Sequence, residues 1–213
     1  MTVIDGRTPA HDTTEPDGRA AGGPEGNERL TAATGAVLLL LFAAEGVTIL
    51  FLGRLLTLHF FIGLLLTGPV VLKIGSTGYR FLRYYTGAPA YRRKGPPAPL
   101  LRLLGPLVVA TSVAVLGTGV ALALLGPDSG PVPVLLLHKA SFVCWVAVMS
   151  VHVLAYLWRL PRLIGADLRR RPARHGTPAP RRAGRWSLLV LALGAGLAVA
   201  LAGVHLVSAW TAR

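Results

Sequence analysis

The sequence is poor in the residues and motifs on which soluble enzymes are built. Its 213 residues include one cysteine, Cys144, and nine aspartates and glutamates. Charged residues make up 15% of the chain, against about 25% in soluble globular proteins. A single cysteine excludes an intrachain disulfide and a cysteine-based metal cluster. There is no Gly-x-Ser-x-Gly elbow, no Walker A motif, no dinucleotide-binding fingerprint and no His-Glu-x-x-His. The sequence therefore gives no sign of a soluble catalytic domain.

Long apolar runs are present instead. Hydrophobic residues make up 53% of the chain, and about 20 apolar residues in succession can cross a bilayer as a helix. Residues 1–30 hold six acids and few large apolar side chains, which predicts a disordered acidic tail ahead of one transmembrane domain, 31–213. We expect an all-α integral membrane bundle with five transmembrane helices, at residues 36–52, 55–74, 107–125, 132–160 and 188–207.

Basic residues are concentrated in two of the connections between these spans. Six lysines or arginines fall in residues 75–104 and eight in residues 161–185, whereas the connections at 53–54 and 126–131 share a single one. The positive-inside rule places the two basic loops and the N-terminus in the cytoplasm. Orientation and contact with anionic lipid head groups explain the net charge of +13. We therefore expect a multi-pass protein of a bacterial plasma membrane, with the lipid bilayer and no nucleic acid as partner.

Two histidines distinguish the fourth predicted span. His138 and His152 are fourteen residues apart. At about 100° and about 1.5 Å per residue, they share nearly the same helix face and lie about 21 Å apart along the axis. An ionisable side chain inside a membrane helix indicates a functional site. The spacing suggests two stacked levels of metal or haem.

A second pattern concerns the depth of the histidines in the membrane. In the predicted topology, His59, His138 and His205 lie near the outer ends of three different helices, so their imidazoles come to a similar level. Haem in a membrane bundle is held between imidazoles of facing helices, and small residues must leave room for the macrocycle. Such residues neighbour these histidines: Gly63, Ser141, Ala202 and Gly203. The ordinary alternative is that each histidine hydrogen-bonds to a neighbouring helix.

With these histidines and five helices, residues 36–210 resemble the bacterial b-type cytochrome membrane subunits. This group includes the di-haem cytochrome b proteins and the gamma subunits of formate dehydrogenase and respiratory nitrate reductase. The resemblance rests on His138 and His152 in one helix and on His59 in an earlier helix. It implies electron transfer between quinone and a redox partner subunit through haem b. His59 and His138 would ligate an outer haem, with His205 as the competing partner.

The inner level departs from that pattern. A second haem at His152 needs another ligand at cytoplasmic depth, but the residue fourteen positions after His59 is Lys73. One alternative is a single haem between His59 and His138. Another is a second haem that uses Lys73, and a third is a proton-transfer or hydrogen-bonding role for His152. Lys73 can also extend its ammonium group to the cytoplasmic surface.

Glu45 lies within the first predicted span, where a carboxylate facing lipid is costly. We expect it to have a partner such as Lys73 or a hydroxyl group, or else to serve a proton path to a quinone. The alternative to an electron-transfer protein, or the electron-transfer subunit of an oxidoreductase, is a non-catalytic membrane scaffold or accessory subunit. Its basic cytoplasmic loops would bind a partner or anionic lipid. Both classes fit the sequence.

Overall fold

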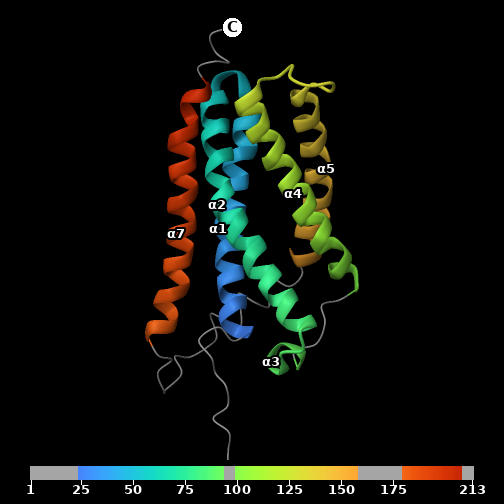
Figure 1. Cartoon of the computed structure of the whole chain (residues 1–213), viewed down its shortest axis with the longest axis vertical. Coiled ribbons are helices and arrows are strands. Elements are labelled where there is room, and N and C mark those ends of the chain that lie inside the picture. The colour runs from blue at the N-terminus through green and yellow to red at the C-terminus, as the bar shows by residue number, and fades with distance from the viewer. Residues whose placement is uncertain (1–23, 94–98, 158–178, 208–213) are drawn as a thin grey trace, which may run out of the picture.

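The computed structural model describes residues 24–93, 99–157 and 179–207. Within these ranges the chain is helical and contains no strand, which confirms the predicted all-α fold class. The helices shown in Figure 1 are α1 (Pro24–Leu50), α2 (Leu52–Tyr85), α3 (Pro89–Arg92), α4 (Pro99–Leu125), α5 (Val134–Leu157) and α7 (Ala179–Gly203), followed by the 3₁₀ helix η1 (Val204–Val207).

Five helices of the described ranges contain a segment long and apolar enough to cross a membrane. Large hydrophobic side chains cover the outside of the bundle, and two on α1, Leu40 and Leu50, are 73% and 77% exposed. Such surface is unfavourable in water and favourable in lipid. The chain is therefore a multi-pass membrane protein, as its apolar runs predict. The segments are Asn27–Leu50, Leu52–Tyr85, Arg102–Leu125, Val134–Ala155 and Gly184–Val207.

Part of the predicted disordered tail is helical. Residues 24–30 form the first turns of α1, so the prediction of disorder is wrong there. Polar side chains of this segment find partners on α2: the Asn27 amide donates to the Ser76 carbonyl oxygen at 2.9 Å, and Glu28 pairs with Arg80 at 3.4 Å. These contacts help to offset the entropy lost on ordering the segment. The rest of the predicted tail lies outside the described residues.

The helices around the first basic connection are longer than predicted. α2 continues past residue 74 to Tyr85, and α4 begins at Pro99 rather than at residue 107. Glycine, serine and threonine after residue 74 suggested a loop, but the helix continues and α3 folds back onto it. The Tyr91 ring of α3 meets the Tyr79 ring of α2 edge-on, with centroids 6.2 Å apart.

The last two spans also differ from their predicted bounds. The span predicted at 132–160 is observed as α5, Val134–Leu157. The span predicted at 188–207 begins earlier, because α7 starts at Ala179 and takes in the end of the predicted basic loop at 161–185. The remainder of that loop lies outside the described residues.

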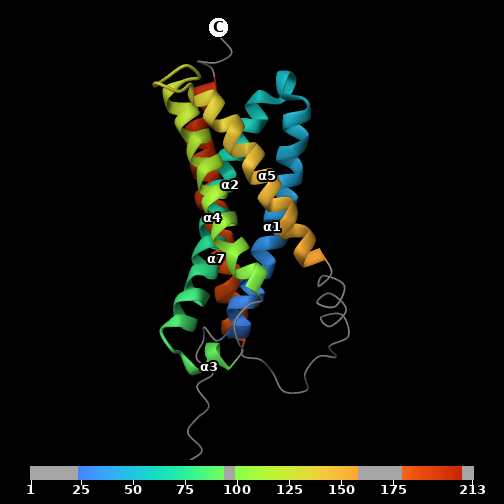
Figure 2. The same cartoon turned by 90° about the vertical axis from the view of Figure 1, so that its right-hand side faces the viewer.

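α2 is the centre of the bundle. It makes extensive contacts with α1 and α7 and a smaller contact with α4, while α4 and α5 form a second antiparallel hairpin. In Figure 1, α7 and α5 lie on opposite sides of the α1–α2 hairpin, and Figure 2 shows α5 crossing in front of α1. The end that carries the α1–α2 turn and the α4–α5 loop is called the turn end here. The end at which α1, α4 and α7 begin is called the basic end.

A small apolar core joins α1 to α2 between these ends. Leu38 of α1 packs with Ile62, Leu66 and Val70 of α2, and all four are buried. Leu116 of α4 packs against this cluster from the second hairpin. The polar residues of the hairpin lie on either side of the core, one group toward each end.

Candidate functional site

Glu45 of α1 is joined to His59 of α2 near the turn end. Glu45 Oε1 lies 3.0 Å from His59 Nδ1. The hydroxyl of Thr48, a residue that is 1% exposed, lies 3.1 Å from the same nitrogen. Glu45 and Thr48 are three residues apart on α1 and therefore share a helix face. The sequence suggested a hydroxyl group or Lys73 as the partner of Glu45. The structure places the Thr48 hydroxyl and the His59 ring beside the carboxylate, whereas Lys73 donates to the Thr31 carbonyl oxygen.

The partners of His59 assign its proton to Nδ1. The Thr48 hydroxyl has one proton, and it donates to the Glu45 backbone carbonyl oxygen at 2.6 Å, with the Glu45 Oε2 atom at 3.2 Å. An ionised carboxylate can only accept hydrogen bonds. Both groups beside His59 Nδ1 therefore act as acceptors, so Nδ1 donates. In a neutral imidazole with this tautomer, the lone pair is on Nε2.

His138 of α5 has a matching arrangement on α4. Its Nδ1 atom lies 3.2 Å from the Thr118 hydroxyl oxygen, which is also 2.9 Å from the Ser141 hydroxyl. Thr118 donates to the Ala114 carbonyl oxygen at 2.7 Å, and Ser141 donates to the His138 carbonyl oxygen at 2.9 Å. With the threonine proton used in this way, Thr118 accepts from His138 Nδ1. The lone pair of His138 is then on Nε2 as well.

The two histidines meet where the two hairpins touch. The ring centroids of His59 and His138 are 6.4 Å apart, and the ring planes make an angle of 68°. The His59 side chain is 22% exposed, and His138 is half-buried. The structure thus brings together two imidazoles from the α1–α2 and α4–α5 hairpins, each with Nδ1 held by its own hairpin.

Gly119 makes room for the His138 ring, whereas a Cβ atom at Gly63 would only touch Glu45. A Cβ atom at Gly63 would lie 3.4 Å from Glu45 Oε1, and one at Gly119 would lie 3.2 Å from His138 Cε1. A Cβ atom at Gly203 would lie 2.5 Å from Leu64 Cδ1. Gly63 and Gly203 were expected to leave space for a macrocycle, but the atoms that face them are those of Glu45 and Leu64.

The inner level contains His152 and Lys73. Lys73 donates from Nζ to the Thr31 carbonyl oxygen at 2.6 Å, against Gly35, whose hypothetical Cβ would lie 3.1 Å from the amine. The ammonium group is therefore directed at α1 within the bundle rather than extended to the surface. His152 is half-buried on α5 and lies close enough to Lys73 for the lysine charge to act on it. The two residues that the sequence placed at the inner level thus face the same interior region.

His205 has a different environment. It lies in η1 at the turn end, and its residue surface is exposed, unlike those of His59 and His138. Among the residues that the structure describes, no group of three or more histidine, cysteine, aspartate and glutamate side chains is arranged to hold a metal ion. A ligand set of two imidazoles suits a metal that brings its own equatorial ligands, as haem does.

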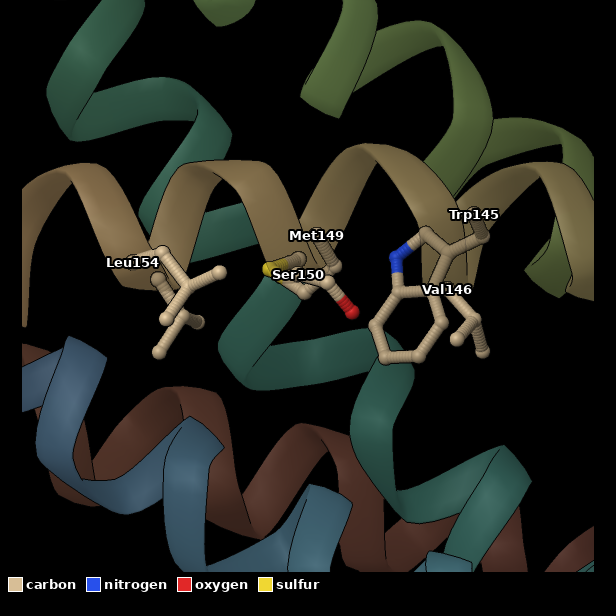
Figure 3. A pocket seen from close by; sticks show the side chains of 6 residues that line it. Trp145, Val146, Met149, Ser150 and Leu154 are labelled. Atoms are coloured by element: carbon tan, nitrogen blue, oxygen red, sulfur yellow. The ribbon is translucent and has the colours of Figure 1, made fainter.

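An open hollow of about 390 Å³ lies along the middle of α5. Figure 3 shows labelled side chains of its lining projecting from one stretch of this helix. Trp145 is the largest of them; its ring packs against Phe42 of α1 at a centroid distance of 4.8 Å, and its Nε1 donates to Ser112 of α4 at 3.0 Å. Neither His59 nor His138 lines the hollow. Its lining residues are Trp145, Val146, Met149, Ser150, Val153 and Leu154.

Sequence reasoning found the two histidines but missed how they are held. The roles of Thr48 and Thr118 were not predicted, and Glu45 was not matched to His59. A usable signal exists, because two antiparallel helices bring together residues that are equally far from the turn between them. Glu45 and His59 lie about equally far from the α1–α2 turn at Phe51, and Thr118 and His138 about equally far from the α4–α5 loop.

Comparisons with protein families, with curated proteins and with solved structures find no match for the chain.

Proposed function

We propose that the protein is a membrane-embedded, b-type cytochrome-like electron-transfer protein that holds one haem b between His59 and His138. The observation that carries the proposal is the pairing of these two imidazoles, with ring centroids 6.4 Å apart. Metal–imidazole bonds are about 2.0–2.1 Å long and each ring centroid lies about 1.2 Å behind its nitrogen, so two imidazoles on one ion have centroids about 6.4 Å apart. The spacing therefore fits axial ligation.

The hydrogen bonds on Nδ1 support the same assignment. A histidine that binds a metal through one ring nitrogen generally donates from the other to a carboxylate, carbonyl or hydroxyl, which fixes the tautomer and the ring orientation. His59 donates to Glu45 and Thr48, and His138 donates to Thr118. In neutral rings of this tautomer, both Nε2 atoms carry the lone pair that a metal would need.

Haem b bound in this way supplies reversible one-electron transfer at its iron, with a potential set by its axial ligands and surroundings. The chain would supply the two ligands and the surroundings of the haem. The two hairpins hold one imidazole each, and the surrounding helices keep the site within an apolar medium. Quinone or a redox partner subunit would deliver and remove the electrons.

One haem per chain fits the inner level better than two. A second haem at His152 would need a free ligand opposite it, and Lys73 is the candidate that the sequence offers. The Lys73 amine instead donates to the Thr31 carbonyl oxygen at 2.6 Å. We therefore assign His152 to electrostatic or hydrogen-bonding contacts inside the bundle.

We further propose that the basic end lies in the cytoplasm of a bacterium, with the histidine pair toward the outer face of the plasma membrane. Most of the described basic residues support this orientation through the positive-inside rule, although Arg54 and Lys139 lie at the turn end. Those in α2 beyond residue 79, in and after α3, and at the start of α4 and α7 all belong to the basic end: Arg80, Arg83, Arg92, Arg93, Arg102 and Arg185.

The test is a reduced-minus-oxidised visible spectrum of protein purified from haem-replete cells, together with a haem-to-chain ratio. We expect a b-type spectrum and a ratio of one. His59→Ala and His138→Ala should each abolish the spectrum while the helical circular dichroism signal is retained. His205→Ala should keep it, since the proposal pairs His138 with His59. A colourless wild-type protein would contradict haem binding and leave the scaffold as the better account.

A further inference from the structure

The two histidines are held by acceptors of different charge. His59 Nδ1 faces the Glu45 carboxylate at 3.0 Å. His138 Nδ1 faces the neutral Thr118 hydroxyl at 3.2 Å. A hydrogen bond to a charged acceptor is roughly twice as strong as one between neutral groups, and the difference is larger still in a medium of low dielectric constant. The two imidazoles are therefore electronically unequal before any metal is bound.

The structure holds the Glu45 carboxylate in place. Thr48 donates to the Glu45 backbone carbonyl and lies 3.2 Å from Oε2, while His59 Nδ1 lies 3.0 Å from Oε1. The Glu45 side chain is 14% exposed. A carboxylate at this depth is costly unless it is paired. The pairing with His59 Nδ1 offsets that cost, so the carboxylate and the imidazole depend on each other.

A carboxylate hydrogen-bonded to a ligating imidazole draws the Nδ1 proton toward itself. The ring then carries more negative charge, and Nε2 becomes a stronger electron donor to the metal. A stronger donor stabilises the more highly charged, oxidised state of an iron centre over the reduced state. A neutral hydroxyl on the other ligand has the same effect to a smaller extent.

We propose that Glu45 is a positioning residue for His59 that sets the redox poise of the site, with Thr118 as its weaker counterpart on His138. This inference rests on the proposed function, because it concerns a group ligated by these two histidines. Glu45 fixes the Nδ1–H tautomer of His59, increases its donor strength and so lowers the midpoint potential. The site would offer a haem iron one stronger and one weaker imidazole donor.

The experiment is a potentiometric titration of the haem spectrum in the wild type and in Glu45→Gln. Glutamine keeps the length of the side chain and its acceptor oxygen but removes the charge. We expect Glu45→Gln to shift the equilibrium at least tenfold toward the reduced state, a rise of about 59 mV for one electron. Thr118→Val should shift it in the same direction by less.

Glu28→Gln is the matched control. It makes the same substitution on the same helix, at the basic end, where Glu28 pairs with Arg80 rather than with a histidine. Its midpoint potential should equal that of the wild type. If removal of any acid from α1 changed the potential equally, the effect would be one of overall charge and the proposal would be overturned.

The outcomes separate the two proposals. A wild-type protein without haem overturns the proposed function, and this inference with it. Haem in both proteins with equal midpoint potentials overturns the inference alone. If Glu45→Gln folds but loses haem, NMR of the haem-free proteins decides. A His59 Nδ1 proton that is more strongly hydrogen-bonded in the wild type than in Glu45→Gln, seen as a downfield shift, supports the inference, and identical histidine signals overturn it.

Discussion

Gly68 of α2 and Gly196 of α7 allow two helix backbones to touch. A Cβ atom at Gly68 would collide with the Ala192 carbonyl oxygen and lie 2.8 Å from the Gly196 amide nitrogen. A Cβ atom at Gly196 would collide with the Leu65 carbonyl oxygen. Helices in a membrane gain no hydrophobic energy by leaving lipid, so their association depends on such close approach at small residues.

Replacement of Gly196 by alanine is therefore expected to separate α7 from α2. The atoms that a new methyl group meets belong to the backbone and cannot rotate away. The loss of stability should be at the upper end of the about 1–3 kcal/mol typical of overpacking, or beyond it. Unfolding in detergent, followed by circular dichroism against added SDS, measures it.

Gly194→Ala provides the control for that experiment. It lies on the same helix, two residues earlier, and a Cβ atom there would meet nothing within 4 Å. Alanine favours helix over glycine by about 1 kcal/mol in water, so this variant should be as stable as the wild type or more so. Equal destabilisation by the two substitutions would argue against the backbone contact.

Trp145 and Ser112 are expected to stabilise the α4–α5 hairpin as a coupled pair. The indole Nε1 donates to the buried serine hydroxyl at 3.0 Å. Trp145→Phe and Ser112→Ala should each cost about 1 kcal/mol or somewhat more. The double variant should cost less than the sum, with a coupling of about 0.5–1.5 kcal/mol. Strict additivity would show that the bond contributes nothing.

Gly119 is expected to control the position of the His138 ring. A methyl group there would lie 3.2 Å from His138 Cε1, so the ring must move by a few tenths of an ångström. Under the proposed function, Gly119→Ala should lower the haem content or alter the spectrum of the purified protein. Gly117→Ala, on the same helix and with nothing within 4 Å of its new Cβ, should leave both unchanged. Equal spectra for the two variants would show that residue 119 does not control the position of the His138 ring.

Tyr91 of α3 is expected to make stability fall at high pH. Burial of its phenol, and next the neighbouring Tyr79, raise the pKa of Tyr91 above its ordinary value. An unfolded tyrosine ionises near pH 10, so the unfolded state loses its proton first. The stabilisation is complete below that pH and is lost as pH rises through the folded pKa. Tyr91→Phe should reduce this dependence in denaturation measured from pH 8 to 11, and an unchanged dependence would contradict it.

Much of the fold follows from local composition. The five spans were predictable because an apolar run of sufficient length can satisfy its backbone hydrogen bonds in lipid only as a helix. Helix ends were less predictable. Residues 24–30 and 75–85 are polar or rich in small residues, and they are helical in the structure. Partners on another helix, such as Arg80 for Glu28, decide these ends, and a sequence read locally does not contain them.

The sequence by itself determined that His59 and His138 lie at the same end of the membrane, because the position of a residue within a span fixes its depth. The distance of each residue from a turn also places Glu45 and Thr118 at the matching levels, but this is clear only from the two hairpins that the structure shows. Only the tertiary structure decided that the two ring centroids lie 6.4 Å apart, with each Nδ1 held by acceptors of its own hairpin. Depth is a one-dimensional property of the chain, whereas the rotation of each helix about its axis is fixed by packing against its neighbours.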